Sequence, residues 1–331
     1  DAEHRDIQLN TATRLYFVTL PESTLEDARG EVKLLMASLE DEWGLTDLRI
    51  ETSELVKLQV ALTSGDRGVT VAVFESTQII GVWSGLFDAP RGVAVDVGST
   101  TVAAHLCDLA TGDVLSSASV MNPQIPFGED LMSRVSYIMM HPEGAETMSS
   151  AIQTALSKLF AELTDQLGET TDNILEVSLV ANPIMHHLVL GINPINLGGA
   201  PFALTIDESV TLKAGDIGLD THSQARLFVL PCIAGHVGAD TAGVILAESP
   251  DSDEGMSLIV DVGTNAEIVL GNKDRLLVCS SPTGPAFEGG EISAGQRATA
   301  GAIERVRIDR ETLEPKFRPS LAWFKNAESR L

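Results

Sequence analysis

The sequence is poor in cysteine, and this shortage excludes several classes of protein. Its three cysteines are Cys107, Cys232 and Cys279, and no two of them form a Cys-x-x-Cys pair. Three widely spaced thiols cannot supply a disulfide scaffold, a zinc site made only of cysteines or a four-cysteine iron–sulfur cluster. Because isolated cysteines persist as thiols in a reducing compartment, we predict a cytoplasmic location.

Basic residues and long apolar runs are also scarce. Lysine and arginine number 22 against 47 aspartates and glutamates, which gives a formal net charge of −25. Such a surface repels phosphate backbones and anionic lipid, which argues against nucleic-acid and membrane-surface partners. No apolar run reaches the ~18 residues that a membrane-spanning helix needs. The apolar share of 44 %, with only 5 % aromatics, predicts globular cores built from aliphatic side chains.

The length and the patterning of the chain predict three domains. Its 331 residues exceed the ~100–200 that are typical of one domain. Residues 1–90 predict a small α/β domain with a β-hairpin over residues 69–83 and without a cluster of catalytic side chains. Residues 91–249 predict a first lobe of apolar strands and helices, and the boundary with residues 250–331 lies in an acidic linker over residues 249–255.

A short pattern occurs twice in the chain. Residues 95–100 (VDVGST) recur as residues 260–265 (VDVGTN), 165 residues later. Each copy follows an apolar strand and precedes two further strands. An internal repeat in the same context implies two related structural units, so residues 250–331 are expected to begin a second lobe like the first.

The repeated turn has the features of a phosphate-binding loop. Its glycine lets the backbone approach a ligand closely, and hydroxyl and amide side chains follow beside backbone N–H donors. The preceding carboxylate is placed to hold Mg²⁺ through water. We predict magnesium ligation at Asp96 and Asp261, and phosphate contacts at Gly98, Ser99, Thr100, Thr101, Gly263, Thr264 and Asn265. One copy would suit an ordinary hairpin turn equally well, whereas two copies favour phosphate binding.

The pair of turns resembles the signature of the actin-like ATPase superfamily, which includes sugar and acetate kinases, chaperone ATPases and actin. This resemblance implies an α/β fold with two actin-like, ribonuclease H-like lobes behind the small α/β domain. The second lobe would be incomplete in this chain. The resemblance also implies ATP and Mg²⁺ as ligands.

In that superfamily, a helix before the second turn carries a carboxylate or an amide that faces the nucleotide. Residues 235–243 (GHVGADTAG) fit this description. Asp240 is therefore the candidate catalytic residue, which would orient the attacking water or hold magnesium, and the alternative is that it caps the helix. Gly284, in a glycine-rich loop, is a further candidate for phosphate contact, although any turn could look the same. Core or helix-capping positions without a chemical role are expected for His186 and His187, and a buried position at a strand end is expected for Cys279.

Several longer motifs resemble one family within the superfamily. They are residues 121–130 (MNPQIPFGED), 133–136 (SRVS), 238–241 (GADT), 260–272 (VDVGTNAEIVLGN) and 284–289 (GPAFEG). Together they resemble the reductive activators of corrinoid-dependent enzymes, the RACo type. The resemblance extends over about residues 15–317 and so includes nearly the whole chain. It implies that residues 15–88, within the small domain of residues 1–90, are the family's middle domain, which follows a linker, and that the ATPase domain begins at residue 92.

This resemblance implies electron transfer gated by ATP. Members of the family carry a ferredoxin domain with a [2Fe–2S] cluster, and they return the inactive Co(II) corrinoid protein of a methyltransferase system to Co(I). Neither that domain nor its four cysteines are present here, and the chain ends before the family's adenosine-binding loop. We therefore expect a fragment that binds ATP weakly or not at all, with the cluster only in the full-length protein. A corrinoid protein is the expected partner, and a homodimer stays open.

Two other functions are also open at this point. A small-molecule kinase of the same superfamily would need a substrate pocket between its lobes. A non-catalytic module would instead use nucleotide binding to control docking to a partner. Four cysteines in ferredoxin spacing upstream of this chain would favour the activator over the kinase, and phosphate release by the full-length protein would separate the activator from the docking module.

Overall fold

The computed structural model of the chain describes residues 9–22, 24–25, 28–263, 265–282, 303–309 and 312–319. It divides into two compact units, Asp1–Glu248 and Ser249–Leu331. Within the described residues, no helix is both long and apolar enough to cross a membrane.

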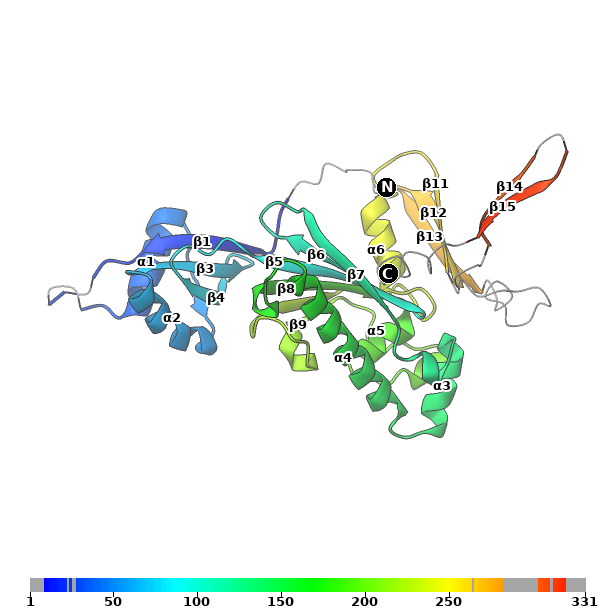
Figure 1. Ribbon diagram of the computed structural model, residues 1–331, viewed down its shortest axis with the longest axis horizontal. Coiled ribbons are helices and arrows are strands. Elements are labelled where there is room, and N and C mark those ends of the chain that lie inside the picture. Colours follow the sequence, from blue (N-terminus) through cyan, green and yellow to red (C-terminus); the bar gives the residue numbers. More distant parts are fainter. Residues whose placement is uncertain are drawn as a thin grey trace, which may run out of the picture. The chain divides into compact units, whose positions relative to one another are not determined.

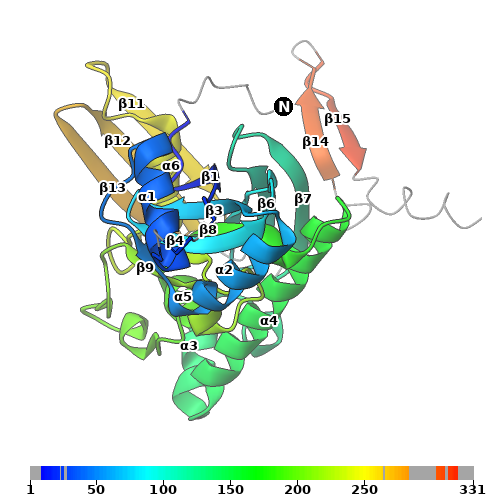
Figure 2. The same ribbon diagram turned by 90° about the vertical axis from the view of Figure 1, so that its left-hand side faces the viewer.

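The first unit begins with a four-stranded sheet that carries two helices on one face (Figures 1 and 2). Its strand order is β1-β3-β4-β2. The elements are β1 (Thr13–Thr19), α1 (Glu31–Trp43), β2 (Arg49–Ile50), α2 (Thr52–Ser64), β3 (Gly68–Phe74) and β4 (Gln78–Ser84). Leu35 and Leu39 are buried because residues four apart share one face of α1. The antiparallel pairing of β3 with β4 confirms the predicted hairpin.

A six-stranded mixed sheet follows. Its strands are β5 (Arg91–Val97), β6 (Thr101–Asp108), β7 (Val114–Met121), β8 (Ile174–Ala181), β9 (Val210–Lys213) and β10 (Arg226–Val229). They lie in the order β7-β6-β5-β8-β10-β9. The first three strands are antiparallel, whereas β8 pairs in parallel with β5, and β10 pairs in parallel with β8. An antiparallel meander extended by parallel strands is the arrangement of a ribonuclease H-like lobe, so the predicted fold class is confirmed.

Helices lie on both faces of the six-stranded sheet (Figure 1). The helical elements are η1 (Ile125–Phe127), α3 (Leu131–Met140), α4 (Gly144–Asp165), η2 (Thr171–Asn173), α5 (Pro183–Val189), η3 (Ile195–Gly198), η4 (Ala214–Ile217) and α6 (Ala239–Glu248). Ile152 and Leu156 of α4 belong to the same core as Val93, Val95 and Val97 of β5. Alternate residues of a strand point to one face, which is why these three valines share the core.

Apolar and charged contacts join the two sheets of the first unit. Ala72 and Ile80 of the small sheet pack with Leu175 of β8 in one buried cluster. Glu51 lies 3.2 Å from the Nη2 atom of Arg226, whose Nη2 also donates to Gln78 Oε1 at 2.7 Å. Burial acts to raise the pKa of Glu51, but hydrogen bonds from lysine and arginine side chains hold that pKa below its usual value. Glu51 therefore stays charged and links the two sheets.

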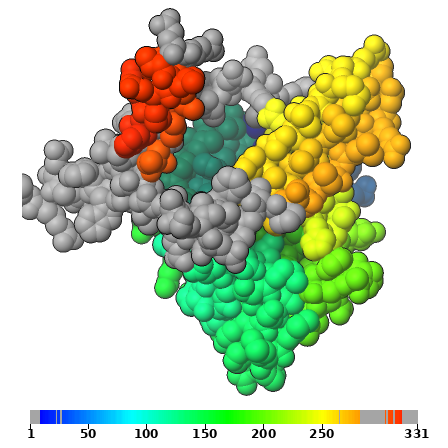
Figure 3. Space-filling model, turned by 90° about the vertical axis from the view of Figure 1, so that its right-hand side faces the viewer, coloured from blue at the N-terminus to red at the C-terminus, as the bar shows by residue number. Residues whose placement is uncertain are grey.

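The second unit contains two small antiparallel sheets. Its strands are β11 (Ser257–Val262), β12 (Asn265–Asn272), β13 (Arg275–Pro282), β14 (Ile303–Ile308) and β15 (Pro315–Pro319). The order β11-β12-β13 is that of an antiparallel meander, as in β5-β6-β7. Leu258, Val260 and Val262 alternate along β11 and are all exposed. The space-filling view shows the segment of β11 to β13 in yellow to orange (Figure 3).

Candidate functional site

Asp96 lies near the carboxyl end of β5, on the face of the sheet opposite the α4 core. Its neighbours Val95 and Val97 are buried, whereas Asp96 itself is exposed. It is in register with Val180 of β8. Because residues in register on adjacent strands point to the same face, the Asp96 and Val180 side chains lie on one side of the sheet.

The turn that follows, residues 98–101, has its carbonyl groups bound to the protein. The side-chain Nδ2 of Asn122 donates to Gly98 O at 2.7 Å, and the Asn122 backbone N–H donates to Thr100 O at 2.8 Å. The Arg134 guanidinium donates to Ser99 O. In a trans peptide the carbonyl and the next N–H point in opposite directions, so the N–H groups after these carbonyls point away from Asn122 and Arg134. Convergent N–H donors at a turn suit an anion such as phosphate.

Gly98 is required by a close approach within this turn. A Cβ atom at this position would lie 2.7 Å from Thr101 O, closer than real Cβ contacts. Any other residue would therefore displace the backbone of the turn. Ser99 is partly exposed, and Thr100 and Thr101 are exposed, so their side chains are accessible to a ligand.

Asp240 lies in the first turn of α6, on the same face of the sheet as Asp96. Two glycines allow α6 to pack closely on β8. A Cβ on Gly243 would lie 3.0 Å from Val180 Cγ1, and a Cβ on Gly238 would lie 2.5 Å from Ala181 O. Since Val180 is in register with Asp96, the beginning of α6 and the end of β5 meet at one edge of the sheet. The Asp240 carboxylate accepts the Thr241 N–H at 2.7 Å.

The second turn lies in the second unit. Asp261 and Gly263 are exposed, and the Gly263 N–H donates to Asn265 O at 2.8 Å. Thr264 and Gly284, two of the predicted phosphate contacts, lie outside the described residues. The structure thus brings Asp96, residues 98–101 and Asp240 together within the first unit.

Two of the predicted core residues are confirmed, and one prediction is wrong. His186 and His187 are buried in α5. Burial, with a smaller contribution from His187, lowers the pKa of His186 to about 4, so its ring is neutral at pH 7. Cys279, expected in a core, is exposed, because it lies in the small sheet of the second unit. Among the described residues, no group of three or more histidines, cysteines or carboxylates is arranged to hold a metal ion.

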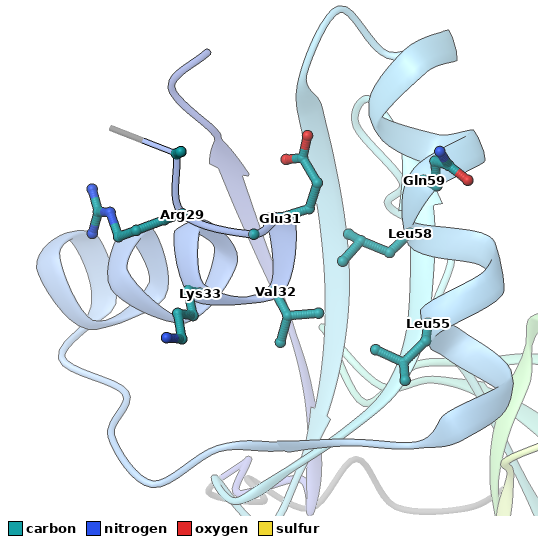
Figure 4. Close-up of a pocket in the computed structure, with 9 residues that line it drawn as sticks. Arg29, Glu31, Val32, Lys33, Leu55, Leu58 and Gln59 are labelled. Carbon is teal, nitrogen blue, oxygen red and sulfur yellow. The ribbon is translucent and has the colours of Figure 1, made fainter. Parts of the chain in front are cut away.

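A surface pocket of about 640 Å³ lies elsewhere, between the start of α1 and α2 (Figure 4). Apolar side chains from Val32, Leu55 and Leu58 line it beside Glu31 and Lys33. It belongs to the small sheet domain and includes none of the residues of the turn or of α6.

Sequence reasoning gave no role to Asn122, Gln124 or Arg134, although all three lie in motifs quoted for the family resemblance. A signal for Arg134 was present in the helix pattern. Arg134, Val135 and Ile138 form the buried face of α3, and an arginine on an apolar face needs acceptors inside the protein. Which acceptors it finds depends on the fold.

Three family models match the chain in succession. Residues 2–89 match the RACo linker region, residues 91–252 the RACo middle region, and residues 255–322 the C-terminal domain of RACo, the ASKHA domain. The chain belongs to the RACo family. The small domain, which was expected to be the family's middle domain, matches the linker model instead. The middle-region model matches the lobe that contains β5 and α6.

Relatives of known name agree with this assignment. The chain is similar to the corrinoid activation enzyme RamQ of Eubacterium limosum, with 37 % identity over 211 residues, 64 % of this chain and 35 % of the relative. It is 28 % identical over 218 residues to the [Co(II) methylated amine-specific corrinoid protein] reductase of Methanosarcina barkeri, which is 64 % of this chain and 40 % of that protein.

A solved structure is similar over nearly the whole chain. This structure is described as a reductive activator for corrinoid, iron–sulfur protein, and it matches with a TM-score of 0.82 and 31 % identity. The match includes 95 % of this chain and 51 % of that one. The chain thus spans between about a third and a half of the length of the relatives that it matches.

Proposed function

We propose that this chain is a fragment of an ATP-dependent reductive activator that returns an inactive Co(II) corrinoid protein to Co(I), and that it supplies phosphate-binding residues to the nucleotide site of the full-length protein. The observation that carries the proposal is the turn at residues 98–101, whose carbonyls are tied to the protein beside Asp96 and Asp240. Two named relatives act on corrinoid proteins or activate them, which supports the choice of partner.

The residues at this edge of the sheet fit a magnesium nucleotide. The N–H groups of residues 99–101 would bind phosphate oxygens, because their preceding carbonyls are already engaged. Asp96 would hold magnesium through water, as Asp261 would in the second turn. Asp240 would orient the water that attacks the γ-phosphate, and its place at the start of α6 supports this role.

The residues of this chain do not fit an iron–sulfur cluster. A [2Fe–2S] cluster of the ferredoxin type needs four cysteines, and this chain has three. One of them, Cys232, is buried with its pKa raised to about 12, which leaves its thiol protonated. In the proposal the electron comes from a ferredoxin domain of the full-length protein, and no step runs through a cluster held by these residues.

Coupling to ATP is needed because the reduction of Co(II) is unfavourable. For a one-electron step, 59 mV corresponds to a tenfold change, or about 1.4 kcal/mol. A typical binding coupling of about 1–3 kcal/mol therefore shifts a potential by only about 40–130 mV. Opening and closing of two lobes around a nucleotide would supply the two-state element that larger gaps require.

The partner and the setting belong to the same proposal. The partner would be the corrinoid protein of a methyltransferase system, and the reaction would take place in the cytoplasm. A homodimer of the full-length protein is also proposed, and light scattering coupled to gel filtration measures its mass directly.

The test follows the cobalt spectrum. The full-length protein is mixed with its Co(II) corrinoid protein and a reductant, and the Co(I) absorbance is recorded with ATP, with ADP and without nucleotide. We expect Co(I) to appear only in the sample that contains ATP. Equal recovery of Co(I) without nucleotide would contradict the coupling, and the transfer of phosphate from ATP to a small molecule would favour a kinase instead.

A further inference from the structure

One cluster of side chains controls the backbone direction of the turn at residues 98–101. Three successive carbonyls, those of Gly98, Ser99 and Thr100, accept hydrogen bonds from Asn122 or Arg134. Asn122 lies in the loop after β7, and Arg134 lies in α3. The turn is therefore held from one side by groups that do not belong to its own hairpin.

The two donors belong to one connected group of side chains, which we call the bracing cluster: Asn122, Gln124, Arg134 and Met185. Arg134 Nη1 lies 3.3 Å from Gln124 Oε1 and 3.1 Å from Met185 Sδ. Asn122 Nδ2 lies 3.6 Å from the same sulfur, and its Oδ1 accepts the Gln124 N–H at 2.9 Å. Gln124 is in turn fixed by a bond from its Nε2 to Met148 O at 3.0 Å. Every member is thus positioned by another.

Arg134 brings a positive charge to the inner side of the turn. Its side chain is completely buried. Burial lowers its pKa to about 10, with Asp130 acting in the opposite direction, so Arg134 stays protonated at pH 7. Its hydrogen-bond partners are neutral: Gly128 O, Ser99 O, Gln124 Oε1 and Met185 Sδ. The Asp130 carboxylate instead caps α3, where it accepts the Ser133 N–H at 2.8 Å.

A buried cation at this place acts through the peptide that joins Ser99 to Thr100. Its guanidinium donates to the carbonyl on one side of the peptide, and the N–H on the other side points away from it. Hydrogen bonds in a chain polarise one another, so this N–H becomes a better donor. The charge itself also attracts an anion in front of the turn, with little screening because water does not surround the guanidinium.

We propose that Arg134 is a positioning residue for phosphate, a buried cation that holds the Ser99 carbonyl and thereby aims the N–H groups of residues 99–101 at the phosphate chain of a nucleotide. The inference rests on the proposed nucleotide binding and adds the residue that gives the turn its charge selectivity. Arg134 itself does not touch the nucleotide. Its contribution to affinity grows with the negative charge of the ligand and is absent for a nucleoside.

The experiment compares ligands that differ in phosphate number. Dissociation constants of ATP, ADP, AMP and adenosine are measured by competition against a fluorescent nucleotide, with the full-length protein and the Arg134→Met variant. We expect roughly a 10–100-fold loss of ATP affinity, the scale of one hydrogen bond to a charged group. The loss should shrink from ATP to AMP and fall below twofold for adenosine.

Arg91 offers a matched control. It is also a buried arginine of this lobe, but it lies at the first position of β5, at the end opposite to the turn. It lies 2.7 Å from Asp108 Oδ2 and from Glu169 Oε1. Arg91→Met should lower the thermal stability while leaving the ratio of ATP affinity to adenosine affinity unchanged.

Two further variants keep the test decisive if Arg134→Met does not fold. Arg134→Lys keeps the charge and loses the planar fork, so it should lose part of the ATP affinity and none of the adenosine affinity. Asn122→Ala releases the Gly98 carbonyl and keeps the cation. It should also lose part of the ATP affinity and none of the adenosine affinity. An equal loss for ATP and adenosine in these variants, or no loss at all, overturns the inference. If the parent protein binds adenosine but not ATP, that result contradicts the proposed nucleotide function itself and, with it, the role of Arg134.

Discussion

The two copies of the VDVG sequence lie at the ends of equivalent strands, but their surroundings differ. β5 and β11 each end in the same three residues, Val-Asp-Val, are followed by a glycine, and begin an antiparallel meander of three strands. Val95 of β5 is 3 % exposed, whereas Val260, at the equivalent position of β11, is 49 % exposed. α4 packs on the β6 and β7 strands beside the first copy. A sequence repeat therefore predicts strands and turns, while burial depends on which other elements pack on them.

The turns themselves also differ. Val97 pairs with Val102, but Val262 pairs with Ala266, so the second loop is one residue shorter. A Cβ on Gly98 would lie 2.7 Å from a carbonyl oxygen, whereas the nearest atom to a Cβ on Gly263 is 3.6 Å away. The carbonyls of the first turn are bound by residues that follow β7, the third strand of the first meander. The corresponding stretch after β13 begins at residue 283, outside the described residues.

The largest expected effect concerns Asp240, which accompanies the first turn. In the full-length protein, Asp240→Asn keeps the size of the side chain and removes the charge that would orient water. We expect ATP hydrolysis to fall by about 10²-fold or more, the scale for the loss of a positioned general base. Asp96→Asn and Asp261→Asn should instead weaken the binding of magnesium nucleotide. Phosphate release under saturating ATP separates these two effects.

Thermal unfolding serves as the control for this prediction. Asparagine replaces aspartate at a helix start with little loss of stability, so the melting temperature should barely change. Hydrolysis at the parent rate would show that Asp240 only stabilises the start of α6, and the catalytic carboxylate would then have to be sought elsewhere.

The second prediction compares the two sheets through equivalent valines. Val95→Ala removes buried methyl groups from the core of the first lobe and should lower the free energy of unfolding by about 2 kcal/mol. Val260→Ala changes a half-exposed side chain and should lower it by about 0.5 kcal/mol or less. Urea denaturation of each variant gives both values. Equal losses would mean that another part of the full-length protein covers β11.

The third prediction compares the two glycines. Gly98→Ala forces the turn to shift, because the new methyl group would overlap Thr101 O, and we expect about a tenfold weaker affinity for magnesium ATP. At Gly263 the new methyl group would meet only ordinary contacts, so Gly263→Ala should change the affinity by less than about threefold. Titration calorimetry on the full-length protein measures both. A larger loss at Gly263 would mean that the second turn contributes more to phosphate binding than the first.

The smallest effect is the histidine contribution to the pH dependence of stability, which belongs to the first unit. All seven histidines precede residue 249, and the pKa of His186 is lowered by burial from 6.5 to about 4. Between these values the unfolded chain binds a proton that the folded chain does not, so stability falls as the pH drops below about 6.5. By linkage, His186 should lower the free energy of unfolding by about 1 kcal/mol when the pH falls from 7 to 5.5.

His186→Leu isolates that contribution, because the titration of carboxylates is common to both proteins. Unfolding free energies at pH 7 and pH 5.5 should differ less for the variant than for the parent, by about 1 kcal/mol. The same pH difference in both proteins would mean that the ring of His186 is protonated in the folded chain.

Periodicity and repetition were sufficient to predict much of the fold. The near-continuous apolar run over residues 92–97 indicated a strand, and the repeated VDVG indicated two related strand–turn–strand units. The glycines at positions 238 and 243 indicated close packing of a helix, which the structure confirms. These features depend on neighbours in the sequence, and local sterics and the period of an element control them.

The sequence by itself determined the strands, the two turns and the family to which the chain belongs. Only the tertiary structure decided that Asn122 and Arg134 bind the carbonyls of the first turn, and that Asp240 meets the edge of the sheet where Asp96 lies. The reason is that a buried donor must find an acceptor, and the acceptor lies wherever the chain returns in space. No spacing along the sequence encodes that meeting of residues 99 and 134, which exists only once α3 has packed beside the sheet.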